Sequence, residues 1–96
     1  MKKLNELHSL DKEVSAISLF KGELGTATAI QLQQKGTLKE HISKTPALLL
    51  CITGFVTYKD ETEKEINLES GDYVDITPNV KHWLYASVES QLVLLK

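Results

Sequence analysis

Turn-forming residues divide most of this chain of 96 residues into short segments with the composition of β-strands. From Val14 onward, Gly, Asn, Asp or Pro recurs at intervals of roughly 8–12 residues, a spacing typical of an all-β sandwich or barrel. The pattern predicts about eight strands, at residues 15–20, 26–33, 38–43, 47–59, 63–67, 73–76, 82–86 and 91–95.

The strand pattern continues to the end of the sequence without a repeat, a low-complexity stretch or a linker. A chain of this length buries only ~60–65% of its unfolded surface, so it has enough apolar residues for one core and not for two. We therefore expect a single barrel domain over residues 14–96, preceded by an N-terminal arm of residues 1–13. Helical periodicity in this arm is weak, so a short helix and an extended segment both fit.

Charge and composition restrict the partners that this chain can have. Its 11 basic and 13 acidic residues give a net charge of −2, so it lacks the positive field that nucleic acids or anionic membranes attract. The longest apolar run, residues 47–52, is far shorter than the ~20 residues of a membrane-spanning helix. Cys51 is the only cysteine, and no signal-peptide pattern follows Met1. We expect a cytoplasmic protein that binds neither nucleic acid nor membrane.

The run at residues 47–52 is apolar on both faces of its predicted strand. Alternation places Ala47, Leu49 and Cys51 on one face, and Leu48, Leu50 and Ile52 on the other. A strand of an isolated two-sheet sandwich normally turns polar side chains to solvent on one face. We therefore expect the outer face to be covered, either by the N-terminal arm or by a second subunit, and we favour a homodimer.

Two stretches each place a histidine near a glycine or proline turn. The first runs from Gly36 through His41 to Gly54, and the second runs from Gly71 through Pro78 to His82. Together they resemble the two motifs of the cupin superfamily. The first cupin motif contains a glycine, two histidines one residue apart, a glutamate and a final glycine. The second contains a glycine, a proline, another glycine, a histidine and an asparagine.

The resemblance covers residues 33–96. The spacing of the matched positions agrees with the cupin motifs more closely than the residue types at those positions do. His41 and His82 stand at a histidine position in each motif, and Gly54 and Gly71 stand at glycine positions. Five other positions differ: Ser43 replaces a histidine, Ala47 the glutamate, Thr77 the proline, Asn79 a glycine and Ala86 the asparagine. The resemblance implies an all-β, single-domain jelly-roll barrel, which is the double-stranded β-helix of the cupins.

The replaced residues bear directly on metal binding. Metal-dependent cupins hold their ion with three histidines and a glutamate, ligands that suit Fe, Mn, Ni or Zn. Only His41 and His82 remain here, fewer than the three protein ligands usual at a catalytic metal. Glu40 lies next to His41 and so faces the opposite side of the strand. We expect no cofactor; the alternative is a divalent metal on both histidines, completed by Cys51 or solvent.

Three functions fit this reading. The leading one is small-molecule binding at the barrel mouth, where the ligand meets His41, Ser43 and His82 against Leu49, Cys51 and Leu84. The second is a metal-dependent enzyme of the dioxygenase or isomerase type that uses the alternative metal site. The third is an interaction module whose barrel is filled by side chains. We expect Trp83 and Tyr85 to face away from the pocket, because they alternate with His82 and Leu84.

Overall fold

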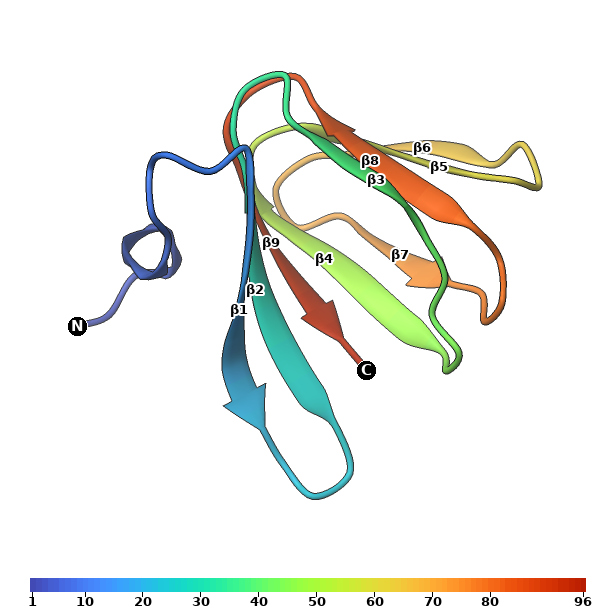
Figure 1. Cartoon of the computed structure of the whole chain (residues 1–96), viewed down its shortest axis with the longest axis horizontal. Coiled ribbons are helices and arrows are strands. Elements are labelled where there is room, and N and C mark those ends of the chain that lie inside the picture. The colour runs from blue at the N-terminus through green and yellow to red at the C-terminus, as the bar shows by residue number, and fades with distance from the viewer.

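The computed structural model describes residues 1–96 and consists of two antiparallel sheets that face each other (Figure 1). A single 3-10 turn, η1 (Leu4–Leu7), precedes nine strands: β1 (Val14–Lys21), β2 (Thr26–Leu32), β3 (Thr37–His41), β4 (Ala47–Thr53), β5 (Val56–Asp60), β6 (Glu65–Leu68), β7 (Tyr73–Ile76), β8 (His82–Ala86) and β9 (Ser90–Leu95). The structure contains no helix that is long and apolar enough to cross a membrane.

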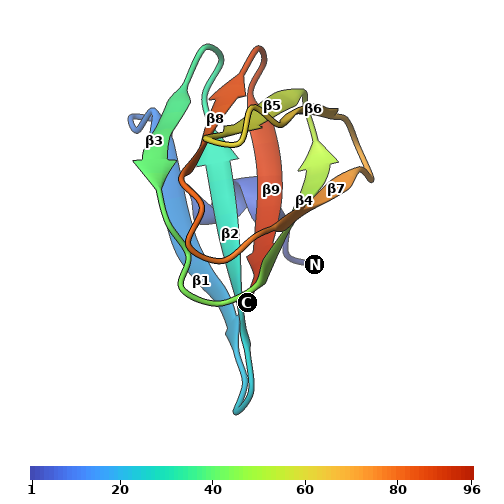
Figure 2. The same ribbon diagram turned by 90° about the vertical axis from the view of Figure 1, so that its right-hand side faces the viewer.

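The five-stranded sheet has the order β1-β2-β9-β4-β7, and the four-stranded sheet has the order β3-β8-β5-β6. The last strand, β9, pairs with β2 on one side and with β4 on the other, so it joins the two halves of the larger sheet. Figure 2 shows this central position of β9, and also shows that the β1–β2 hairpin extends beyond the body of the molecule. The larger sheet therefore joins strands that are far apart in the sequence.

The core lies between the two sheets and is built from alternate residues of their strands. On β4, Ala47, Leu49 and Cys51 are buried in it, whereas Leu48, Leu50 and Ile52 are half-buried on the outer face, which confirms the predicted alternation. Full burial of a leucine side chain stabilises a fold by roughly 1.5–3 kcal/mol relative to its exposure. The buried apolar side chains on the inner face of β4 thus help to hold the two sheets together.

One predicted strand is wrong: residues 47–59 do not form a single strand. They form β4 in the five-stranded sheet and β5 in the four-stranded sheet, and the chain changes sheets at Gly54. Gly54 has a φ of +105°, a backbone conformation that side chains with a Cβ rarely adopt. The structure therefore has nine strands rather than eight.

The N-terminal arm lies on the side of the five-stranded sheet that faces away from the other sheet (Figure 1). Its only regular element is η1, which has no buried residue. The imidazole of His8 contacts the hydroxyl of Ser15 on β1, with 2.7 Å between Nδ1 and Oγ. The arm thus lies against the outer face at β1, and Leu48, Leu50 and Ile52 on β4 stay only half-buried.

Candidate functional site

His41 and His82 lie side by side at one end of the four-stranded sheet. His41 ends β3 and His82 begins β8, and the antiparallel register of these strands pairs the two residues directly. Their ring centroids are 4.1 Å apart and their planes meet at 61°, so the rings contact each other edge to face. The register shifts between Leu38 and His41, and this irregularity sets the last residue of β3 opposite the first of β8.

The two imidazoles have different surroundings. His82 is only 2% exposed, and its ring stacks on Tyr58 with 5.7 Å between centroids, whereas His41 is exposed to solvent. Burial lowers the pKa of His82 from its ordinary value, and the neighbouring His41 lowers it further, against a hydrogen bond to Val80 that raises it. His82 is therefore neutral near pH 7, and His41 is the imidazole that meets solvent.

Hydrogen bonds to the backbone fix the same tautomer in both histidines. Nδ1 of His41 lies 3.2 Å from the carbonyl oxygen of Lys39, and Nδ1 of His82 lies 3.2 Å from that of Val80. A carbonyl oxygen only accepts hydrogen bonds, so in each neutral ring Nδ1 carries the proton and Nε2 keeps a lone pair. Each ring is thus held in an orientation that leaves Nε2 as its acceptor atom.

Very little empty space remains inside the barrel. A cavity of about 10 Å³ lies beside the two histidines, and its walls are Ile30, Leu38, His41, Leu49, Ile76, His82, Leu84 and Leu94. This volume corresponds to about one water molecule at most. A ligand larger than water cannot enter the barrel unless the side chains move.

A much larger groove opens outward from the same point, between β1 and β3. Its volume is about 590 Å³, and it is lined by Glu13, Val14, Ala16, Thr28, Ile30, Thr37, Leu38, Lys39, His41 and Leu94. His41, Ile30, Leu38 and Leu94 line both the groove and the interior cavity. His41 therefore stands at the boundary between the groove and the packed interior.

The structure brings together four of the six residues that the sequence proposes as ligand-binding: His41, Leu49, His82 and Leu84 border the interior cavity. Ser43 does not border it, and its hydroxyl donates to the carbonyl of Thr45. Cys51 is also outside the cavity wall, and its thiol donates to the carbonyl of Thr53. Burial raises the pKa of this thiol, and the charges of Asp72 and Glu69 raise it further.

The donor atoms present do not fit a metal centre. No group of three or more His, Cys, Asp or Glu side chains could hold a metal ion. Cys51 therefore does not join His41 and His82 in a three-ligand site. Two imidazoles alone fall short of the three protein ligands usual at a catalytic metal.

Sequence reasoning missed the residues that shape the groove. Ile30 and Leu94 belong to predicted strands, and alternation along those strands was the signal that would have assigned them to the inner face. Tyr58 stacks on His82 and is buried in the core, whereas a single strand over residues 47–59 would place it on the outer face with Leu48 and Leu50. Trp83 and Tyr85 face away from the buried side of β8, as predicted.

The turn after β5, residues 61–65, is exposed to solvent, but the last residue of the strand is not. Asp60 is buried, and its Oδ1 accepts hydrogen bonds from the backbone of Thr62 and Lys64 and from the Thr62 hydroxyl. Burial raises the pKa of Asp60, but these hydrogen bonds outweigh it and lower the pKa overall. Asp60, opposite His82 in the register, therefore fixes the turn at this end of the barrel.

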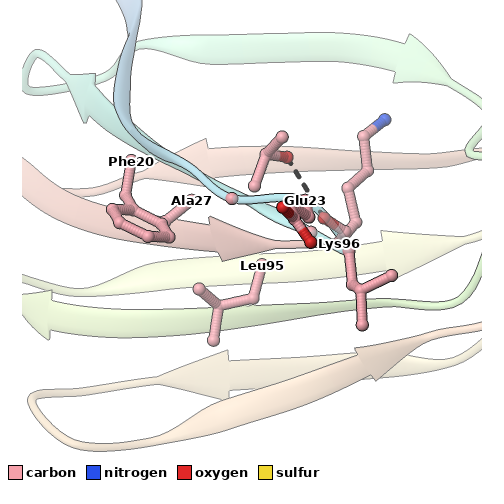
Figure 3. Close-up of a pocket in the computed structure, with 9 residues that line it drawn as sticks. Phe20, Glu23, Ala27, Leu95 and Lys96 are labelled. Carbon is pink, nitrogen blue, oxygen red and sulfur yellow. Dashed lines mark hydrogen bonds between the residues drawn. The ribbon is translucent and has the colours of Figure 1, made fainter.

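A larger hollow, of about 710 Å³, lies at the turn of the projecting β1–β2 hairpin, beside Leu95 and Lys96. Figure 3 shows Phe20, Ala27 and Leu95 around it, with Glu23 and Lys96 nearby. The hydroxyl of Thr26 donates to the carbonyl of Lys96 there. None of the residues that line this hollow is buried, so it has the character of an apolar surface rather than of a reaction site.

Neither a protein-family model nor a curated protein matches the sequence, but solved structures match the fold closely. A cupin superfamily protein from Desulfitobacterium hafniense superposes with a TM-score of 0.84 over 97% of this chain and 84% of its own, at 11% identity. The fold is that of the cupins.

Two further cupin-like structures agree with this result. An RmlC-like cupin from Methanocaldococcus jannaschii, described as a double-stranded β-helix, has a TM-score of 0.75 at 20% identity, over 93% of this chain and 84% of its own. KdgF from Halomonas sp. has a TM-score of 0.79 at 14% identity, over 95% and 88%. The cupin fold that residues 33–96 suggested is confirmed. Identities this low establish the fold alone.

Proposed function

We propose that this cupin-fold protein binds a small molecule in the groove between β1 and β3, with His41 as the polar contact. The observation that carries the proposal is the position of His41. Its ring is exposed in a groove of about 590 Å³ while its edge rests against buried His82 and its Nδ1 is held by the backbone. A fixed acceptor at the base of an open groove is suited to orienting a ligand.

The groove walls indicate what kind of molecule fits. Val14, Ala16, Ile30, Leu38 and Leu94 supply apolar surface along its length. Polar groups lie near its edge, where Glu13 accepts a hydrogen bond from the backbone of Thr37. A mostly apolar ligand with one hydroxyl or N–H group would bury its apolar part on these walls and donate to Nε2 of His41.

The proposed role is binding rather than metal-dependent catalysis. A sensor, a carrier or an accessory protein needs only the groove and His41. A metal-dependent dioxygenase or isomerase needs a third protein ligand, which the donor set around His41 and His82 does not provide. We therefore assign no reaction step to the two histidines.

The test is a screen of small phenols, alcohols and amines by thermal shift, followed by titration of each hit. His41→Ala should weaken binding at least tenfold, because it removes the only imidazole in the groove. Glu40→Ala is the matched control, because Glu40 is the neighbouring exposed residue on β3 and does not line the groove. Equal weakening by both variants, or binding that survives His41→Ala, would contradict the proposal.

Metal dependence is tested separately. Binding of a hit should be the same with and without a chelator, and elemental analysis of protein purified without chelator should give well under one metal ion per chain. A stoichiometric metal that is lost in His41→Ala and His82→Ala would support the metal-dependent enzyme instead.

We also propose that the chain forms a homodimer through the outer face of the five-stranded sheet. Leu48, Leu50 and Ile52 are only half-buried there, and Tyr73 is exposed on the neighbouring strand. Leu95 pairs with Leu48 in the register, so the exposed apolar residues of the hairpin hollow, Phe20 and Leu95 among them, adjoin this surface. Light scattering should give twice the chain mass of 10.7 kDa. A monomer mass at all concentrations would refute the dimer.

A further inference from the structure

A row of polar side chains crosses the outer face of the five-stranded sheet, on the side opposite the groove. Ser15 on β1, Gln31 on β2 and Gln91 on β9 are direct neighbours in the register, and all three are buried. His8 of the N-terminal arm lies over one end, with its Nδ1 2.7 Å from the hydroxyl of Ser15. Polar side chains are mostly exposed in proteins, so this buried row requires an explanation.

Hydrogen bonding within the row is incomplete. Nε2 of Gln91 donates to Oε1 of Gln31 over 2.7 Å. Three buried side-chain atoms of the protein lack a partner, and all three belong to this cluster: Nε2 of His8, Nε2 of Gln31 and Oε1 of Gln91. An unpartnered buried polar atom costs about 1–3 kcal/mol, so their concentration in one place is a substantial local penalty.

The unpartnered atoms of the two glutamines form a complementary pair, one donor and one acceptor. This result also holds when the two amides are flipped together. The bond between the two side chains uses one N–H and one oxygen, so exchanging oxygen and nitrogen in both amides again leaves one of each. A group that carries an acceptor and a donor on neighbouring atoms would satisfy both.

A pocket of about 390 Å³ adjoins the row between the arm and the sheet. Its walls are Lys3, Leu4 and Asn5 of the arm, Ile52 and Thr53 of β4, and Glu89 and Gln91. A water molecule takes up ~30 Å³ of liquid, so the pocket has room for more than one water. Gln91 belongs both to this pocket and to the incompletely bonded row.

The arm that closes this region is attached by few contacts. Its turn η1 buries no residue, and residues 1–10 meet the barrel through His8, whose ring contacts Ser15, and through the carbonyl of Leu10, which accepts a hydrogen bond from Gln33 at 3.3 Å. The other hydrogen bonds between the arm and the barrel are made by Glu13, where the arm joins β1. Segments with little buried apolar surface open locally at low cost in free energy. Movement of the arm would join the pocket to the row.

We propose that the row of Gln31 and Gln91 beneath the N-terminal arm is a second binding site, which takes a small molecule carrying a carboxamide. The carboxamide oxygen accepts from Nε2 of Gln31, and its N–H donates to Oε1 of Gln91. Nε2 of His8 is a third contact, supplied by the arm as it closes. The site is independent of the groove beside His41, because the two lie on opposite faces of the five-stranded sheet.

Titration with acetamide, followed by the side-chain NH₂ resonances of Gln31 and Gln91 in a ¹⁵N NMR spectrum, tests the proposal on the full chain. Acetate is the matched probe, since it has nearly the same shape but no N–H donor. Acetamide should give saturable shifts in these resonances and in the backbone amides of the arm, with at least tenfold weaker effects from acetate. Equal responses to both probes, or no saturable response to acetamide, would overturn it.

Two variants test whether Gln31 and Gln91 are the residues that bind acetamide. The double variant Gln31→Leu/Gln91→Leu removes both amides together, a change that is nearly neutral for folding when the shapes match. It should abolish the acetamide shifts of the arm. Gln34→Leu is the control, because Gln34 is exposed and lies outside the row. Shifts of the arm that persist in the double variant would refute the site. If the double variant does not fold, the comparison of acetamide with acetate on the unmodified chain still tests the proposed site.

Discussion

Replacing Gly54 with alanine tests how the chain changes from one sheet to the other. A Cβ added at Gly54 would lie 2.2 Å from Oγ, 2.6 Å from Cβ and 2.7 Å from Cα of Ser90. The Cα atom belongs to the backbone of β9, so no rotamer change can remove the clash. The strand that joins the two halves of the larger sheet would have to move.

The expected cost has two parts. Forcing an alanine into a φ of +105° costs about 1–3 kcal/mol of backbone strain. Displacing a packed neighbour costs about 1–3 kcal/mol more. The sum of roughly 2–6 kcal/mol is large against the ~5–15 kcal/mol by which whole domains are stable. At ~4–8 °C per kcal/mol for a domain of this size, Tm should fall by at least about 8 °C.

Gly71→Ala is the matched control for the strain alone. Gly71 has a φ of +89°, but no atom lies within 4 Å of the position that its Cβ would take. Urea unfolding followed by the fluorescence of Trp83, the only tryptophan, measures both variants. Gly54→Ala should lose about 1–3 kcal/mol more than Gly71→Ala, the part that comes from overpacking. Equal losses would refute the close approach of β9, and a loss below about 0.5 kcal/mol would refute the strain as well.

Three further predictions concern buried polar groups. Burial lowers the pKa of His8 and of His82. The contribution of each neutral imidazole to the free energy of unfolding should therefore be fully present above pH ~6.5. Below that pH the free energy of unfolding should fall, by up to ~1.4 kcal/mol per pH unit for each histidine, until the pH reaches the folded-state pKa. A urea midpoint unchanged between pH 7.5 and 5.5 would contradict this. Asp60→Ala should cost about 1–3 kcal/mol because three donors lose their acceptor, whereas Asp60→Asn should cost less, since it keeps one amide oxygen; equal urea midpoints for the two variants would rule out this role. The buried Cys51 thiol, with its raised pKa, should react with a thiol reagent far more slowly in the native protein than in urea, and similar rates would show that it is accessible.

The cupin fold could be predicted from the sequence because its signals are local. Turn residues at regular intervals mark the ends of strands, and the period of two in a strand assigns the residues of β4 to its two faces. The positions of His41 and His82 in two glycine-bounded stretches carried the resemblance to the cupins. Each of these signals depends on a few neighbouring residues, so none of them requires knowledge of the tertiary structure.

The candidate site could be predicted only in part. The sequence indicated that His41 and His82 belong together, but it gave no basis for their difference in exposure. It also included Ser43 and Cys51, whose side chains bond to nearby carbonyls and do not border the cavity. Alternation gives the face on which a side chain lies but not its distance from residues on other strands.

The sequence by itself determined the strand class of this protein, the faces of β4 and the two histidines that meet. Only the tertiary structure decided the sheet change at Gly54, the place of β9 between β2 and β4, the groove beside His41 and the amide row under the arm. The physical reason is the distance along the chain between the residues that interact. Local periodicity follows from backbone geometry, whereas strand pairing, cavities and unpartnered groups depend on contacts between residues far apart in the chain.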